Sequence, residues 1–317
     1  MEGDDPWPMK KSSIDNFFKW FCFCCAGLIG LLMLGFFIQL SLNSKQVWDV
    51  FGWRFLISTE WDPVAEKFGA LPSIVGTLCT TLIALIIALP LALAAAMFLV
   101  HATPMIRAVL GHAIDLLAAI PSVIYGMWGL FVLVPFMQTK IQPFLAETLK
   151  IQQIPVVGRF LAEDYYNGFG ILTGGLILSI MILPYICAIL RDVLQMTPPM
   201  LREAAYGVGC TRLEAGKDIV IPYGIRGILG GVFVGLGRAL GETMAVLFVI
   251  GNMMEMPQNA FSGSTTIAAT IANCFPEADG LQRSALFALG LILLLMSLFI
   301  QIVAQSYLRA ATAHRGE

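Results

Sequence analysis

The chain has 317 residues, of which 58% are hydrophobic and only 13% are charged, and its formal net charge at pH 7 is −2. Soluble domains carry roughly 25% charged residues, so this composition excludes an ordinary water-soluble globule and predicts a polytopic membrane protein. The small net charge gives no sign of a surface that binds nucleic acid.

Six apolar segments are long enough to cross a bilayer, whose hydrocarbon core takes about 20 apolar residues of helix. In chain order they run from Trp20 to Leu40, Leu71 to Val100, Ala108 to Met137, Phe169 to Leu190, Ile225 to Gly251 and Ser284 to Leu308. We therefore expect an all-α fold with six transmembrane helices. The first segment is too long for the core of a signal peptide, and no small-residue cleavage site follows it.

The second and third segments are longer than a straight crossing needs, and each contains a proline. Pro90 lies in the second segment and Pro121 in the third. Proline removes a backbone donor and clashes with the preceding helical turn, so the sequence predicts kinks or breaks at these two positions.

The distribution of basic residues predicts the orientation. With six spans, both termini lie on one side of the membrane. Eleven of the 19 lysines and arginines lie on that side, seven lie on the other, and Arg238 lies inside a span. The positive-inside rule therefore places both termini in the cytoplasm. Much of this bias comes from residues 191–226, the loop between the fourth and fifth spans.

The loop 191–226 contains signals for two short helices. Thr197 followed by Pro198 predicts an N-cap with proline at the first helical position. We expect a helix from Met200 to Tyr206, ended by Gly207 or Gly209. The pattern Thr211-x-x-Glu214 is a capping box that would start a second helix, and Pro222 would end that helix before the fifth span.

A longer pattern runs through the same loop: Glu203-Ala204-Ala205, then Gly209, then Ile219-Val220-Ile221-Pro222. Composition alone would favour an ordinary connecting loop. The spacing, however, resembles the EAA loop of ABC importer permeases, which reads E-A-A, three residues, G, nine residues and I-x-L-P. Ile221 stands where leucine is usual. The resemblance implies a coupling helix that docks in a groove of a separate cytoplasmic ATPase.

The resemblance assigns ATPase coupling to Glu203, Ala204, Ala205, Gly209, Ile219 and Pro222. Small side chains at Ala204, Ala205 and Gly209 would allow close approach to the ATPase, and Glu203 would pair with Arg202 at a polar rim. We expect Glu203 and Gly209 to transmit movement without binding substrate.

The chain has no catalytic or metal-binding motif of its own. It lacks the G-x-x-x-x-G-K-[ST] sequence of a P-loop, so ATP and Mg²⁺ would bind to the partner ATPase and this chain would hold no cofactor. Its seven cysteines show no metal-ligand spacing, and only Cys274 would lie on the far side of the membrane, so we expect no disulfide framework.

The fifth span combines three glycines with two charges. Gly227, Gly231 and Gly235 follow each other at intervals of four, which lets membrane helices approach closely. On an ideal helix, Arg238 and Glu242 fall on the same face as these glycines. We therefore expect this face to contact protein or a water-filled path rather than lipid.

The charges are costly at this depth. A central arginine costs roughly 2.5–3.5 kcal/mol on insertion scales, whereas an exposed i, i+4 partner returns only about 0.2–0.5 kcal/mol. A purely structural salt bridge between Arg238 and Glu242 is one interpretation. The other is a translocation path for an anion, because the planar guanidinium suits an oxyanion. In that hypothesis Glu242 holds Arg238 until the anion passes.

Two stretches, GLGRALGETMAVLFVIGN at 235–252 and AAIPSVIYGMWGLFVLVPF at 118–136, resemble the permeases of phosphate ABC importers. The resemblance implies inorganic phosphate as cargo and the bacterial cytoplasmic (inner) membrane as location. It also implies a PstA-like second permease, a PstB-like ATPase dimer and a PstS-like periplasmic phosphate-binding protein as partners, besides membrane lipid.

The same resemblance implies the type I ABC importer permease fold. Residues 71–308 would form the ABC transporter type-1 transmembrane domain, with the coupling loop at 191–226. Residues 1–70 would hold an N-terminal cytoplasmic segment, the first transmembrane helix and a periplasmic loop, and residues 309–317 a cytoplasmic tail.

Three alternatives stay open on the sequence. The cargo could be another oxyanion. An ion-coupled secondary transporter could use Arg238, Glu242 and Asp115 as a relay, although this would not explain the EAA spacing. An intramembrane enzyme would need a nucleophile and base, or a motif such as H-E-x-x-H, and the chain has neither.

Overall fold

The computed structural model describes the backbone of residues 13–145 and 167–313. Within these ranges the regular structure is helical and contains no strand, which confirms the all-α prediction. The helices are α1 (Ser13–Asn43), α2 (Lys45–Phe51), α3 (Arg54–Ile57), α4 (Leu71–His101), α5 (Pro104–Ala118), α6 (Ser122–Trp128), α7 (Val134–Phe136), α9 (Ile171–Gln195), α10 (Pro199–Gly207), α11 (Arg212–Ala215), α12 (Ile221–Leu240), α13 (Met244–Leu247), α14 (Ile267–Cys274) and α15 (Gly280–Ala313). Shorter π-helical segments cover Gly129–Leu133, Met137–Ile141 and Gly216–Val220, and a 3-10 turn covers Phe275–Glu277.

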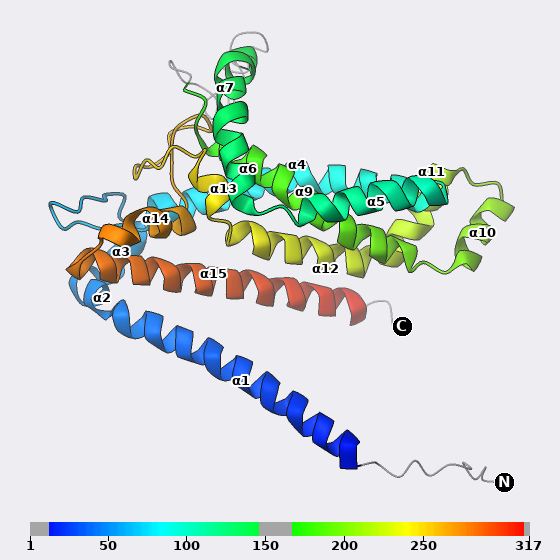
Figure 1. Cartoon of the computed structure of the whole chain (residues 1–317), viewed down its shortest axis with the longest axis horizontal. Helices are drawn as coiled ribbons and strands as arrows, with labels where there is room; N and C mark the ends of the chain where they lie inside the picture. Colours follow the sequence, from blue (N-terminus) through cyan, green and yellow to red (C-terminus); the bar gives the residue numbers. More distant parts are fainter. Residues whose placement is uncertain (1–12, 146–166, 314–317) are drawn as a thin grey trace.

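Six helical segments in the described residues are long and apolar enough to cross a membrane, as the sequence predicts. They are Asn16–Asn43, Leu71–His101, Ser122–Ile141, Ile171–Gln195, Arg212–Leu240 and Gly280–Ser306. In Figure 1 the helices α4, α9, α12 and α15 run along one common direction. The short helices α10 and α11 lie at one end of this bundle, and α2, α3 and α14 lie at the other.

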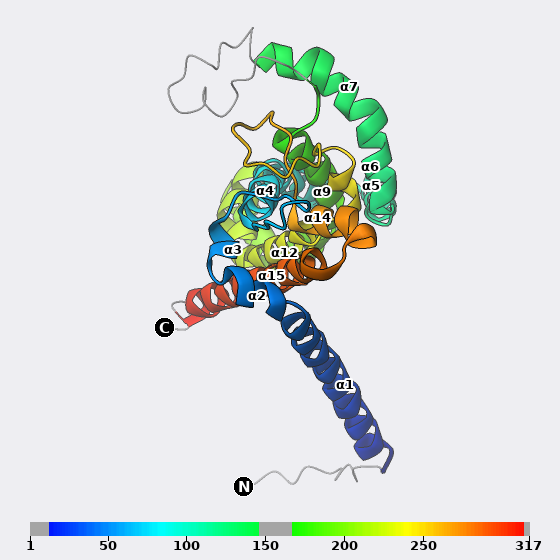
Figure 2. The same ribbon diagram turned by 90° about the vertical axis from the view of Figure 1, so that its left-hand side faces the viewer.

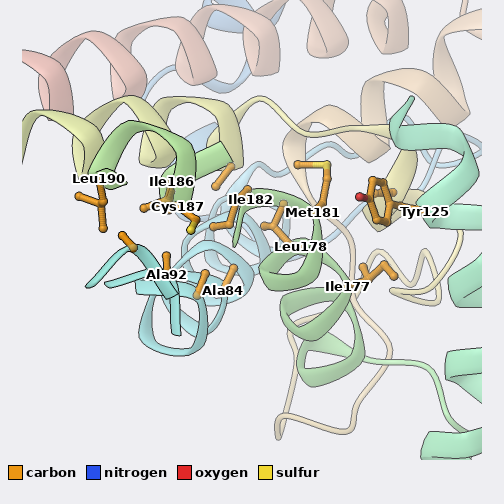
Figure 3. Close-up of a cluster of buried hydrophobic side chains, with 14 of the residues drawn as sticks. Ala84, Ala92, Tyr125, Ile177, Leu178, Met181, Ile182, Ile186, Cys187 and Leu190 are labelled. Carbon is orange, nitrogen blue, oxygen red and sulfur yellow. The ribbon is translucent and has the colours of Figure 1, made fainter. Parts of the chain in front are cut away.

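The core of the bundle is the contact between α4 and α9. Four alanines of α4 recur at intervals of four and are fully buried: Ala84, Ala88, Ala92 and Ala96. Figure 3 shows the larger side chains of α9, including Ile182 and Leu190, gathered against this alanine face. Small residues on one helix let the backbones approach closely, which is how membrane helices gain packing energy when lipid offers no hydrophobic driving force.

The two prolines have different effects on the second and third spans. The third span breaks at Pro121, as predicted, but it is not the single helix expected from Ala108 to Met137. Helix α5 ends at Ala118, and α6 begins at Ser122 and turns away from the bundle (Figures 1 and 2). Helix α4, in contrast, continues through Pro90.

Helix α1 stands apart from the bundle, as Figure 2 shows. It contacts α15 and α2, and none of its membrane-length window is buried. Its apolar side chains therefore need lipid or another membrane helix as their surroundings.

Candidate translocation and coupling sites

The charged pair of the fifth span does not lie on one helix. The span was expected to run to Gly251, but α12 ends at Leu240 and residues 241–243 form a turn before α13. Two local features explain this end. Gly241 is a poor helix former, and the Glu242 carboxylate accepts a hydrogen bond from the Ala245 backbone N–H at 3.1 Å, which satisfies a donor in the first turn of α13.

Arg238 contacts an aromatic ring instead of Glu242. Its guanidinium carbon lies 5.3 Å from the centroid of the Tyr185 ring on α9. Arg238 and Glu242 are both described residues, and no ion pair joins them within 4.0 Å, so the expected helical i, i+4 pairing is wrong. An arginine over a tyrosine ring gains a cation–π attraction that keeps its hydrogen-bond donors free. Arg238 is exposed on this chain.

The glycine ladder of α12 packs directly against α9. A Cβ atom at Gly227 would lie 2.5 Å from Val193 Cγ1, and one at Gly231 would lie 2.8 Å from Ile189 Cγ2. At Gly235 the nearest atoms would be those of Ile186, at 2.7 Å. Arg238 follows these glycines on α12 and reaches the same partner helix through Tyr185.

Replacing Gly227 by alanine is expected to destabilise the chain, whereas Gly230→Ala is expected to stabilise it slightly. Both changes gain about 0.8–1 kcal/mol of helix propensity. A Cβ at Gly230 meets nothing within 4 Å, whereas at Gly227 overpacking costs about 1–3 kcal/mol. Thermal unfolding of the two variants in one detergent measures the difference, and equal melting temperatures would contradict this account of the packing.

Sequence reasoning missed two residues beside the Arg238 turn. Tyr185 is a single tyrosine within an apolar span, and no spacing marked it. Gly126 of α6 lets that helix rest on α13, because a Cβ there would lie 2.6 Å from Phe248 Cδ2 and 2.7 Å from the Met244 carbonyl oxygen. Gly126 belongs to the stretch 118–136 that resembles phosphate permeases. That resemblance was the one feature of the sequence that could have pointed to a role for Gly126.

The start of the first loop helix differs from the prediction. Helix α10 begins at Pro199, its N-cap is Pro198, and no side chain caps it. The Thr197 hydroxyl is buried and has no hydrogen-bond partner among the described residues, so Thr197 is not the N-cap. The helix starts one residue later than predicted, at Pro199, because the fixed φ of this proline suits the first helical position.

The end of α10 is built on Gly209. The N–H of Cys210 donates to the Ala205 carbonyl at 3.1 Å, and the N–H of Gly209 donates to the Tyr206 carbonyl at 3.0 Å. Gly209 has φ +92°. These three features define a Schellman motif, whose left-handed residue favours glycine. A Cβ at Gly209 would meet nothing within 4 Å of this chain, so the backbone conformation, not crowding, requires glycine here.

The remaining EAA residues of α10 divide between the inside and the surface. Ala205 is buried, and Glu203 and Ala204 are exposed. Arg202 donates from Nη2 to the Leu194 carbonyl at 2.6 Å, which caps the end of α9. The expected pairing of Arg202 with Glu203 is therefore wrong, and the Glu203 carboxylate is left on the surface.

The second loop helix runs directly into the fifth span. Thr211 and Glu214 form the predicted capping box, in which each side chain accepts from the other residue's backbone N–H. Helix α11, the π-helical turn Gly216–Val220 and α12 then follow without a break. Pro222 therefore does not end the helix; it directly follows the π-helical turn, so the irregular hydrogen bonding of that turn coincides with the proline's missing N–H. Ile219 lies in the π-helical turn.

Asp115 lies apart from the Arg238 turn. Its carboxylate is half exposed and lies 3.5 Å from Arg191 Nη1 at the loop end of α9. Arg191 also contacts Asp192 at 3.0 Å. A relay through Arg238, Glu242 and Asp115 has no direct ion-pair contact among these described residues, so the geometry gives no support to the secondary-transport alternative.

Comparisons with known proteins agree with this architecture. The family model described as "Binding-protein-dependent transport system inner membrane component" matches residues 88–312. A protein of Mesorhizobium japonicum named "Phosphate transport system permease protein PstC" is 48% identical over 291 residues, which cover 91% of this chain and 88% of that protein. A Haemophilus influenzae protein of the same name is 44% identical and covers 93% of each chain.

A solved structure shares the fold. It is an inward-facing form of the MetNI methionine ABC transporter, and its matched chain aligns with a TM-score of 0.53 over 76% of this chain and 94% of that one. The sequence identity is 14%, so this likeness concerns the fold alone.

Proposed function

Because the chain belongs to the family of binding-protein-dependent transport system inner membrane components, we propose that it is the permease subunit of an ATP-driven phosphate importer. The observation that carries this proposal is its 48% identity to a phosphate transport system permease over most of both chains. Residues 71–308 would form the transmembrane domain, and the loop 191–226 would couple it to ATP hydrolysis.

Arg238 is the residue that would meet the cargo. It is the one arginine that follows the glycine ladder of α12, and its guanidinium is exposed beside Tyr185. A permanently charged, planar donor set binds phosphate through paired hydrogen bonds. The exposure of Arg238 on a single chain supports a path that a second, PstA-like permease completes.

The surface of α10 and α11 would bind the ATPase. Glu203 and Ala204 are exposed there, and so are several large apolar side chains, of which Met200, Val208 and Leu213 are the most exposed. Apolar residues rimmed by charge are typical of a protein interface. ATP and Mg²⁺ would bind to that PstB-like partner, and a PstS-like binding protein would deliver phosphate to the opposite side.

The proposed orientation follows from the coupling surface. If the ATPase is cytoplasmic, the bundle end that carries α10 and α11 faces the cytoplasm, and so do both termini. This agrees with the distribution of lysines and arginines along the sequence. The exchange of Arg238 between Glu242 and the passing anion stays a prediction that no contact in this structure supports, because Glu242 accepts from the Ala245 N–H and Arg238 lies over Tyr185.

Reconstitution tests the proposal. The chain would be incorporated into liposomes with its second permease and ATPase, and uptake of radiolabelled phosphate would be measured in the presence of the binding protein. We expect uptake to require Mg-ATP and the binding protein and to be unaffected by a protonophore. Uptake driven by a proton gradient without ATP would overturn it, and sulfate in place of phosphate serves as the control for oxyanion selectivity.

A further inference from the structure

A groove of about 670 Å³ lies between the loop end of α4 and the α11–α12 segment, away from Arg238, and it borders the proposed ATPase surface at Leu213. Its walls on α4 are mainly apolar and include Leu93, Ala94, Met97 and Phe98. Across the groove lie Arg212 and Lys217. Gly216 makes the approach close, because a Cβ there would clash with Met97.

The charged residues that line the groove are all basic, as expected of a site that binds an anion. None of its lining residues is acidic, and among the described residues neither Arg212 nor Lys217 takes part in an ion pair. Glu214, the nearest acid of α11, uses its carboxylate in the capping box with Thr211. His101 lines the same end, and its Nε2 has no hydrogen-bond partner among the described residues.

The groove also has the depth of one membrane leaflet. Its lining on α4 extends from Pro90 to His101, at the loop end of the span. Eleven steps of 1.5 Å cover about 16 Å, which is about half of a hydrocarbon core about 30 Å thick. The apolar wall lies along this depth, and the cations lie at its loop end. A free phosphate would satisfy the cations and leave the apolar wall uncovered.

We propose that this groove binds one anionic phospholipid of the cytoplasmic leaflet. Its headgroup phosphate would contact Arg212 and Lys217, and an acyl chain would lie along Leu93, Ala94 and Phe98. Basic pockets at the cytoplasmic ends of membrane helices attract such headgroups. The proposal rests on the orientation given above. The bound lipid would brace α11 against α4 and so stabilise the joint between the coupling helix and the fifth span.

Lipid binding to the purified full-length chain tests this without any transport assay. The chain would be titrated with phosphatidylglycerol in neutral detergent micelles, and the rise in melting temperature would give an apparent affinity; phosphatidylcholine is the reference lipid. Since a basic residue near an anionic surface contributes about 1 kcal/mol, we expect Lys217→Gln to weaken the phosphatidylglycerol affinity about fivefold. Lys19→Gln, which removes an exposed lysine from α1 at the same membrane side, should leave it unchanged.

A second pair of variants tests the apolar wall with all charges kept. Ala94→Trp fills the groove and should abolish the difference between phosphatidylglycerol and phosphatidylcholine. Leu91→Trp places the same ring at an exposed position of α4 outside the groove and should retain it. Equal stabilisation of the wild-type chain by both lipids would overturn the proposal. So would an equal shift produced by inorganic phosphate, which would assign the cations to a free anion. A chain that binds lipid here but transports no phosphate would refute only the transport function.

Discussion

The Arg238→Lys variant is expected to lose most phosphate uptake while it still folds and inserts. Lysine keeps the positive charge but lacks the planar fork that pairs with two phosphate oxygens. One hydrogen bond to a charged group contributes about 1.5–3 kcal/mol, so its loss from the transition state would slow uptake roughly tenfold to a hundredfold. The initial rate of radiolabelled phosphate uptake, corrected for the amount of chain in the membrane, measures this effect.

Tyr185 supplies the control for Arg238. Tyr185→Phe keeps an aromatic face under the guanidinium 5.3 Å away and should transport at a rate close to that of the wild type. Tyr185→Leu removes the cation–π contact, which is worth about 0.5–2 kcal/mol. Its rate of phosphate uptake should lie between those of the wild type and Arg238→Lys. Normal uptake by Arg238→Lys would show that charge alone suffices and would refute the bidentate role.

The Gly209→Val variant is expected to uncouple ATP hydrolysis from transport. Gly209 has φ +92° and ends α10, and a β-branched residue is strained in this conformation. The Schellman hydrogen bonds would be lost, and the exposed Glu203 would no longer be held on a fixed helix. We expect the ATPase to stop responding to phosphate-loaded binding protein, whereas the amount of chain in the membrane would be unchanged.

Gly207 offers a matched control for this substitution. It is also exposed, and a Cβ there also meets nothing within 4 Å, but it lies within α10 and its φ is not positive. Gly207→Val should therefore remain coupled, and Gly209→Asn should retain part of the coupling because asparagine tolerates positive φ. Uncoupling by both valine variants alike would mean that bulk against the ATPase, rather than backbone conformation, is the cause.

Hydropathy predicted that six membrane helices exist, because each needs a long apolar run and few other arrangements satisfy the backbone in lipid, but it misplaced the start of the third and the end of the fifth. The capping box at Thr211 could also be predicted from the sequence, since it depends on two residues three positions apart in the chain. These features are local, so a single sequence contains the information that determines them.

The end of the fifth helix could not be predicted from the sequence, because it depends on contacts between distant residues. The residues after Glu242 are as apolar as those before Arg238, so hydropathy continues where the helix stops. The turn depends on the Glu242 carboxylate, which accepts from the Ala245 N–H, and on α6, which rests on α13 through Gly126. That contact joins residues more than a hundred positions apart. Pro222 was misread because the π-helical turn before it has no sequence pattern of its own.

The unbroken run from Arg212 to Leu240 makes the second half of the coupling loop, from α11 onward, and Arg238 parts of one rod. The rod is 29 residues long, about 43 Å at 1.5 Å per residue. The direction of the Arg238 side chain around the helix axis is therefore fixed relative to α11. Each inserted or deleted residue would rotate Arg238 by about 100° around that axis. A change of length in this segment alters the direction in which the cargo-binding side chain points, whereas the turns between other helices can absorb such a change.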